Sequence, residues 1–196
     1  MRYWDKQTSS HLHSHNANKY RKAHPAYRSH TALRRDFPPS YEATMKILYS
    51  WKNFVENQRG WAFFQAVQSD KREKAAQHLL LCHAIPYSRQ YDLDISPETD
   101  AGRGSTDVKV SRGRDKTLVE IKLSSNPQYI HGYQTQLQEY SLAEETDKLI
   151  YVFIDVGNPL RREKLRELHR QNKRDGIPCP ELIIIDAQPK CGASTY

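Results

Sequence analysis

The 196-residue chain contains no apolar run that approaches the roughly 18–20 residues a membrane-spanning helix requires. No apolar stretch follows the first charged residues, so a secretory signal is not expected either. Only three cysteines occur, Cys82, Cys179 and Cys191, and their spacing matches no paired metal-ligand motif. An odd cysteine count in an unexported chain is typical of reduced thiols, so the sequence predicts a cytoplasmic protein without a membrane partner.

The net charge of +7 is concentrated at the start of the chain. Residues 1–36 hold eight Lys and Arg side chains against two aspartates, a net of +6, whereas the rest carries 22 basic and 21 acidic groups. A basic, polar segment of this kind commonly adds nonspecific affinity for nucleic-acid phosphates. A solvated tail without a partner fits the same composition equally well.

The composition also divides the chain into two parts. Residues 1–38 are rich in Ser, His, Asn and Arg, have no apolar period, and end at a Pro-Pro step. Such a segment cannot bury enough surface to offset its ordering entropy, so we expect a basic flexible arm. Residues 39–196 are long enough for one buried core and are expected to form a single domain.

From Ser40 onward the hydrophobic pattern predicts alternating helices and strands. Helices are expected over 40–60, 61–67, 70–85, 130–140 and 159–174, and strands over 91–95, 106–110, 117–123, 149–156 and 182–185. The helix at 70–85 is expected to end before Pro86. The order is a helix, a three-strand meander, a helix, a strand, a helix and a strand. It predicts an α/β fold in which helices flank a central mixed sheet of about five strands.

One strand carries an unusual pair of charges. Residues two apart in a strand point to the same face, so Glu120 and Lys122 stand side by side. If the preceding strand pairs with this one through the loop at 111–115, Asp107 can face the same edge. The opposite, core-facing side then takes Val119, Ile121 and Leu123.

Two carboxylates at one edge make an oxygen-rich site suited to Mg²⁺ or Mn²⁺. Asp107 and Glu120 would hold the metal, and the carbonyl of Ile121 could add a ligand. Lys122 would orient an attacking water, lower its pKa or neutralise developing charge, as phosphodiester hydrolysis requires. The plain alternative is a Glu–Lys ladder on a solvated strand face.

A longer pattern surrounds these residues. It runs Gly102-Arg103-Gly104-Ser105-Thr106-Asp107, a hairpin, Val119-Glu120-Ile121-Lys122-Leu123, then a helix with Tyr133, Gln136, Leu137 and Tyr140. Its order and spacing resemble the PD-(D/E)XK nuclease superfamily, which has a restriction-endonuclease-like fold. The resemblance covers residues 70–157 and departs at Thr106, where the superfamily has proline.

The resemblance implies a Mg²⁺-dependent deoxyribonuclease with an αβββαβ core and extra N-terminal helices. It makes Gln136 and Tyr140 active-site supports. It also matches Glu73 to a glutamate that many members carry on the helix before the first strand, with Gln77 one turn further along. The acid three residues after Asp70 could instead belong to a capping box. Candidates for contact with nucleic acid are Arg103, Arg34 and Arg35.

The partner implied is nucleic acid, DNA rather than RNA, and the resemblance suggests a role in phage defence, restriction or repair. A homodimer, or a helicase or defence-system partner, would fit such roles. One alternative is a catalytically inactive PD-(D/E)XK-fold subunit that binds nucleic acid or acts as a scaffold. Another is a small protein-interaction module, which would show neither metal dependence nor affinity for DNA.

Overall fold

The computed structural model describes residues 37–100 and 105–190. These residues form a five-stranded sheet in the order β1-β2-β3-β4-β5. The strands are β1 (Asp94–Asp100), β2 (Ser105–Arg112), β3 (Asp115–Leu123), β4 (Leu149–Asp155) and β5 (Glu181–Asp186). The first three form an antiparallel meander, and β3, β4 and β5 are parallel. The predicted α/β class and mixed five-stranded sheet are therefore confirmed.

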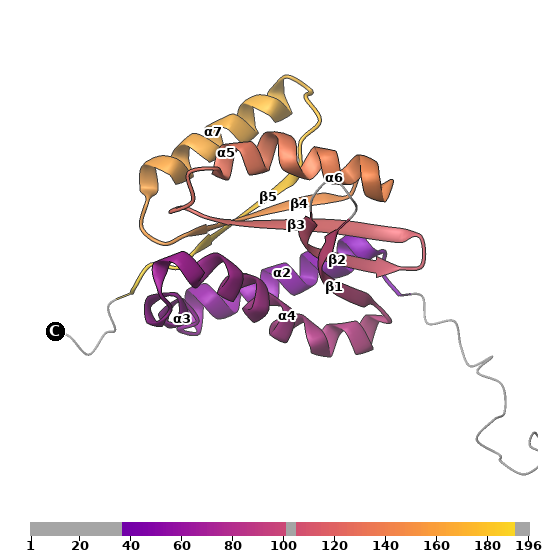
Figure 1. Cartoon of the computed structure of the whole chain (residues 1–196), viewed down its shortest axis with the longest axis horizontal. Helices are drawn as coiled ribbons and strands as arrows, with labels where there is room; N and C mark the ends of the chain where they lie inside the picture. The colour runs from indigo at the N-terminus through magenta and orange to yellow at the C-terminus, as the bar shows by residue number, and fades with distance from the viewer. Residues whose placement is uncertain (1–36, 101–104, 191–196) are drawn as a thin grey trace, which may run out of the picture. The chain divides into compact units, whose positions relative to one another are not determined.

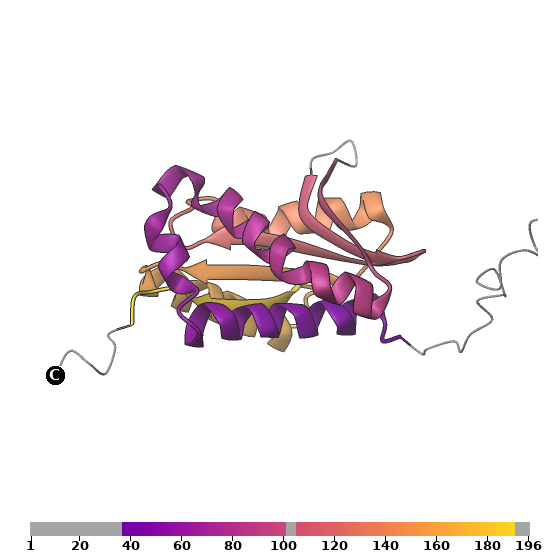
Figure 2. The same ribbon diagram turned by 90° about the horizontal axis from the view of Figure 1, so that it is seen from below.

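Helices cover both faces of the sheet (Figures 1 and 2). One face carries α2 (Ser40–Asn57), α3 (Trp61–Ala66), the short 3₁₀ turn η2 (Ser69–Lys71) and α4 (Arg72–Tyr91). The other carries α5 (Tyr129–His131), the π-helical segment η3 (Gly132–Gln136), α6 (Leu137–Glu144) and α7 (Pro159–Arg174). Among the described residues, no helix combines the length and the apolar character needed to cross a bilayer.

Two apolar clusters fill the spaces between the layers. The cluster beneath α2 and α4 contains Trp51 and Leu80 and takes Val119 and Ile121 from β3. The cluster beneath α5 to α7 takes the even-numbered Leu118 and is otherwise largely aromatic. The alternation of side chains along β3 therefore has its expected result, with the odd positions in the first core. The even positions, which include the two charged ones, face the second helical layer.

The predicted end of the third helix was wrong. We expected a stop before Pro86 and a strand at 91–95, but α4 continues through Pro86 to Tyr91 and β1 begins only at Asp94. A proline inside a helix costs about 3 kcal/mol because it removes a hydrogen bond. Here Tyr87 and Tyr91, beyond the proline, stack on each other and pack against the core, and these contacts favour the longer helix. The helix ends where Asp92 adopts the left-handed conformation with φ of 52°.

Candidate active site

The pairing of β2 with β3 brings Asp107 against the middle of β3. Val108 faces Val119 in the register of the two strands, so Asp107 lies one step beyond that pair. Its Oδ2 accepts a hydrogen bond from the backbone N–H of Ile121 at 2.6 Å. The carboxylate is buried, with 8% of the residue exposed. Ile121 thus enters the site through its N–H, which fixes the orientation of Asp107.

Glu120 and Lys122 lie side by side on the face of β3 that α5, η3 and α6 cover. The ammonium Nζ of Lys122 donates to Oε1 of Glu120 at 2.5 Å. Both residues are buried, with 1% of Glu120 and 7% of Lys122 exposed. The second oxygen of Glu120, Oε2, is also buried and has no hydrogen-bond donor. An unpaired buried carboxylate oxygen is costly, so this atom is the acceptor in the cluster that would gain most from a ligand.

Helix α4 adds two side chains from its first turns. Oε2 of Glu73 accepts from the backbone N–H of Leu123 at 3.3 Å, and Oε1 lies 3.5 Å from Lys122 Nζ. The amide Nε2 of Gln77 donates to Oδ1 of Asp107 at 2.6 Å. The capping-box alternative for Glu73 is wrong, because α4 begins without any side-chain cap and the carboxylate points to β3 instead.

The second helical layer closes over the same group. Gln136 Nε2 donates to the hydroxyl of Tyr140 at 3.1 Å. A Cβ on Gly132 would lie 3.3 Å from Cε of Lys122 and 3.4 Å from Oε1 of Gln136, so the helix backbone approaches the lysine closely. Gly132 begins the π-helical segment, a feature often found at functional sites. The apolar period of the sequence predicted neither the π-helical segment nor the close approach of Gly132 to Lys122.

The charges of the cluster are strongly coupled. Burial raises the pKa of Asp107 and of Glu120. The negative charges of the neighbouring acids raise both pKa values further. Burial alone would lower the pKa of Lys122, but Glu120 and Asp107 outweigh it and hold this pKa above its usual value. The ammonium is therefore charged at neutral pH. Three acidic groups, Glu73 included, lie around this one cation, and the raised pKa of Glu120 means that Glu120 retains a proton at neutral pH. A second cation would replace that proton.

The donor atoms of this cluster suit a divalent cation, but their present spacing does not. Oxygen donors are what Mg²⁺ and Mn²⁺ prefer, and Glu120 Oε2 lacks a partner. However, over residues 37–100 and 105–190 no three His, Cys, Asp or Glu side chains are spaced to hold a metal ion. Lys122 lies between Glu73 and Glu120 and contacts both. Metal binding would thus require the ammonium to leave Glu120.

The cluster reaches the surface beside Glu73. A cavity of about 460 Å³ is lined by Glu73, Leu123, Asn126 and four neighbours from the segments before α4 and after β3. The Glu73 side chain is 27% exposed, so it joins the buried carboxylates to this opening. The predicted nucleic-acid contacts Arg34, Arg35 and Arg103 lie outside the described residues, as does the predicted arm up to residue 36.

The family to which the chain belongs can be recognised from its sequence. A family model matches residues 40–158, more than half of the chain. The chain is a member of the family described as "Domain of unknown function (DUF8371)". No curated protein and no solved structure matches it. The matched residues run from α2 to the end of β4 and contain the whole charged cluster, so the cluster is part of this family's domain, whereas α7 and β5 lie beyond it.

Proposed function

We propose that this protein is a metal-dependent nuclease of the PD-(D/E)XK type that hydrolyses phosphodiester bonds in DNA. The observation that carries the proposal is the meeting of Asp107, Glu120 and Lys122 in one buried cluster. An acid and a base buried at the centre of a sheet are costly unless they serve a ligand or each other. They also contact Glu73 and Gln77 of α4. A solvated strand face would not have such contacts, whereas a functional site would.

The order of elements supports the same assignment. Helix α4 precedes the meander β1-β2-β3, a helical segment follows, and β4 then pairs parallel with β3. This sequence of elements agrees with the αβββαβ core of the restriction-endonuclease-like fold, with α2 and α3 as the extra N-terminal helices.

In the proposed mechanism Asp107 and Glu120 would hold the cation. The cation, when bound, would polarise the phosphate and stabilise charge on the leaving oxygen. Gln77 and the Ile121 N–H fix the two oxygens of Asp107 and so orient it. Lys122 remains protonated, so it acts as a donor that neutralises developing charge rather than as a general base. Glu73, 3.5 Å away, offers the ammonium an anionic partner when it leaves Glu120.

The test is cleavage of supercoiled plasmid by the full chain with Mg²⁺, against the same reaction with EDTA. Asp107→Asn and Lys122→Ala are expected to lose at least about a hundredfold in rate, as removal of a transition-state contact does. Lys116→Ala is the matched control, since Lys116 lies on the same strand but pairs with Glu144. Cleavage that persists in both site variants would overturn the proposal.

The nuclease is proposed to act in the cytoplasm, in restriction, phage defence or repair, on DNA rather than RNA. An RNA transcript of the plasmid sequence, incubated under the same conditions, tests that preference. Salt-dependent binding of DNA without any cleavage would instead favour an inactive nucleic-acid-binding subunit.

A further inference from the structure

Three reactive side chains meet on the face of the sheet that carries α7. Nδ1 of His169 lies 2.8 Å from the hydroxyl of Tyr133 and 4.0 Å from Sγ of Cys179. Tyr133 comes from η3, His169 from α7, and Cys179 from the segment before β5. The proposed nuclease mechanism uses none of them.

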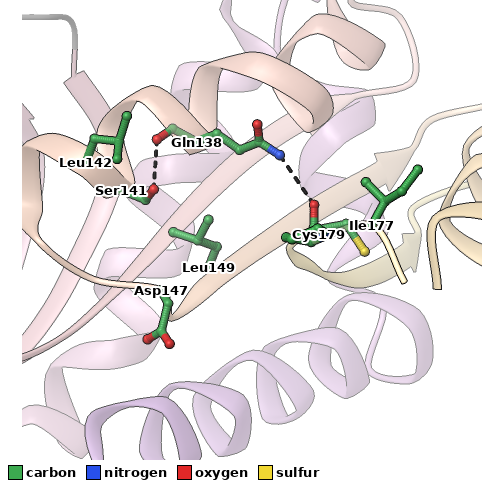
Figure 3. A pocket seen from close by; sticks show the side chains of 8 residues that line it. Gln138, Ser141, Leu142, Asp147, Leu149, Ile177 and Cys179 are labelled. Atoms are coloured by element: carbon green, nitrogen blue, oxygen red, sulfur yellow. Dashed lines mark hydrogen bonds between the residues drawn. The ribbon is translucent and has the colours of Figure 1, made fainter. Parts of the chain in front are cut away.

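Cys179 also lines a cavity of about 570 Å³ between α6 and the segment before β5. Figure 3 shows Leu142 and Leu149 on one side of this cavity and Ile177 and Cys179 on the other. Leu142 is 75% exposed and Ile177 49%, so the cavity has an apolar rim in contact with solvent. Cavities of a few hundred cubic ångströms with apolar walls are suited to small organic ligands.

The thiol can be approached from a second direction. A neighbouring cavity of about 490 Å³ is lined by Tyr41 and Lys148 and shares Asp147, Leu149 and Cys179 with the first. Cys179 itself is half-buried. Cys179 can therefore be reached by a ligand from either cavity and is partly shielded from water.

His169 is placed to accept the thiol proton. Burial lowers the pKa of His169, and Lys173 lowers it further, while Glu181 acts weakly in the opposite direction. The imidazole is therefore neutral at neutral pH. In the tautomer that carries its proton on Nε2, the one lone pair of Nδ1 accepts a hydrogen bond from the Tyr133 hydroxyl at 2.8 Å. Rotation of that O–H away from the ring frees Nδ1 for the thiol, whose Sγ lies 4.0 Å away. A thiol beside a neutral imidazole is the arrangement that generates a thiolate nucleophile.

We infer that Cys179 is a covalent-modification site for small apolar electrophiles of the α,β-unsaturated carbonyl class, with His169 as its base. The thiol proton passes to Nδ1 of His169 as Sγ forms a bond to the β-carbon of the electrophile. The electron pair of the carbon–carbon double bond moves toward the carbonyl as an enolate. The enolate then takes the proton from the imidazolium at its α-carbon, which restores neutral His169 and needs no oxidant.

The experiment measures adduct formation by intact-mass spectrometry with N-ethylmaleimide as the probe. In a full-length Cys82→Ser, Cys191→Ser chain, Cys179 is the remaining thiol; in Cys179→Ser, Cys191→Ser it is the exposed Cys82. Cys179 is expected to react at least about tenfold faster than Cys82 at neutral pH, although Cys82 is the more exposed. His169→Gln should slow Cys179 at least about fivefold and leave Cys82 unchanged. A Cys179 rate no greater than that of Cys82, or one insensitive to His169→Gln, would overturn the inference.

A second comparison tests the cavity and remains informative if His169→Gln fails to fold. Leu142→Gln changes the cavity rim, whereas Leu160→Gln changes a similarly exposed leucine of α7 that does not line it. The preference of Cys179 for N-phenylmaleimide over iodoacetamide should fall at least about threefold in Leu142→Gln and stay constant in Leu160→Gln. Equal preference in both variants would mean that the cavity does not select the electrophile. The test does not depend on DNA cleavage.

Discussion

The side-chain amide of Gln77 donates a 2.6 Å hydrogen bond to Oδ1 of Asp107, joining α4 to β2 across 30 residues of sequence. Gln77 is 8% exposed, and its own Oε1 is buried without a partner. Together with the Ile121 N–H on Oδ2, this bond fixes both oxygens of Asp107. The orientation of the candidate ligand is thus set by α4 as much as by the sheet.

Replacement of Gln77 by Leu should destabilise the chain and misplace Asp107. The variant leaves a buried carboxylate oxygen without its donor, which costs about 1–3 kcal/mol. Removal of the unpaired Oε1 of Gln77 offsets only part of this cost, because the acceptor left without a partner belongs to an acidic group. Urea unfolding measures this loss, and plasmid cleavage, assayed without urea where the chain is folded, should fall with it. His78→Ala is the matched control, since His78 is the next residue on α4 and is exposed. Equal stability of both variants would show that the bond contributes nothing.

Gly132→Ala tests whether the close packing against Lys122 outweighs the higher helix propensity of alanine. In an ordinary helix this change stabilises by about 1 kcal/mol. Here the added Cβ lies 3.3 Å from Cε of Lys122, so the lysine must shift by a few tenths of an ångström. We expect the stability gain to vanish and plasmid cleavage to drop about tenfold, because small displacements of a catalytic group are costly. A stabilised variant with full activity would contradict the close approach.

Mn²⁺ binding should depend on Glu120 and on pH. Binding is measured by the electron paramagnetic resonance signal of free Mn²⁺, independently of any cleavage. Because burial raises the pKa of Glu120 and of Asp107, protons compete with the metal, and affinity should fall as pH is lowered toward the acidic range. Glu120→Gln should lose at least about tenfold in affinity, whereas Glu139→Gln, an exposed change on α6, should not. Affinity that is the same at acidic and alkaline pH would exclude these carboxylates as ligands.

Asp115, the first residue of β3, is expected to make the stability of the fold fall in acid. Burial opposes ionisation of Asp115, but hydrogen bonds from Lys148 and Ser40 outweigh it and lower its pKa from the usual 3.8 to about 2. A lowered carboxyl pKa stabilises the fold above the unfolded value, and this stability is lost as pH falls through about 2. Asp115→Asn should therefore cost about 1–2 kcal/mol at neutral pH.

Urea titrations of Asp115→Asn and of the wild type, repeated at decreasing pH, measure that contribution. The two proteins should differ most near neutral pH and converge in strong acid, where the wild-type carboxylate is also protonated. A difference in stability that does not change with pH would mean that the charge of Asp115 is irrelevant.

The sequence alone determined which side of each strand faces a core. The alternation at 117–123 requires Glu120 and Lys122 to share a face, because side chains in a strand repeat every second residue. The continuous apolar run at 149–156 required a strand covered on both faces, as β4 is. These properties depend on residues that are close in sequence, and a local pattern is enough to specify them.

The tertiary structure alone decided which elements meet. Hydrophobic periodicity predicts the buried face of α4. It does not predict that Gln77 contacts Asp107, or that Glu73 contacts Lys122 instead of capping its helix. It also did not foresee that Tyr87 and Tyr91 would carry α4 past Pro86, or that Gly132 would lie against Lys122. Apart from the stacking of Tyr87 on Tyr91, each of these depends on contacts between different helices and strands, and such contacts leave no local signal in the sequence.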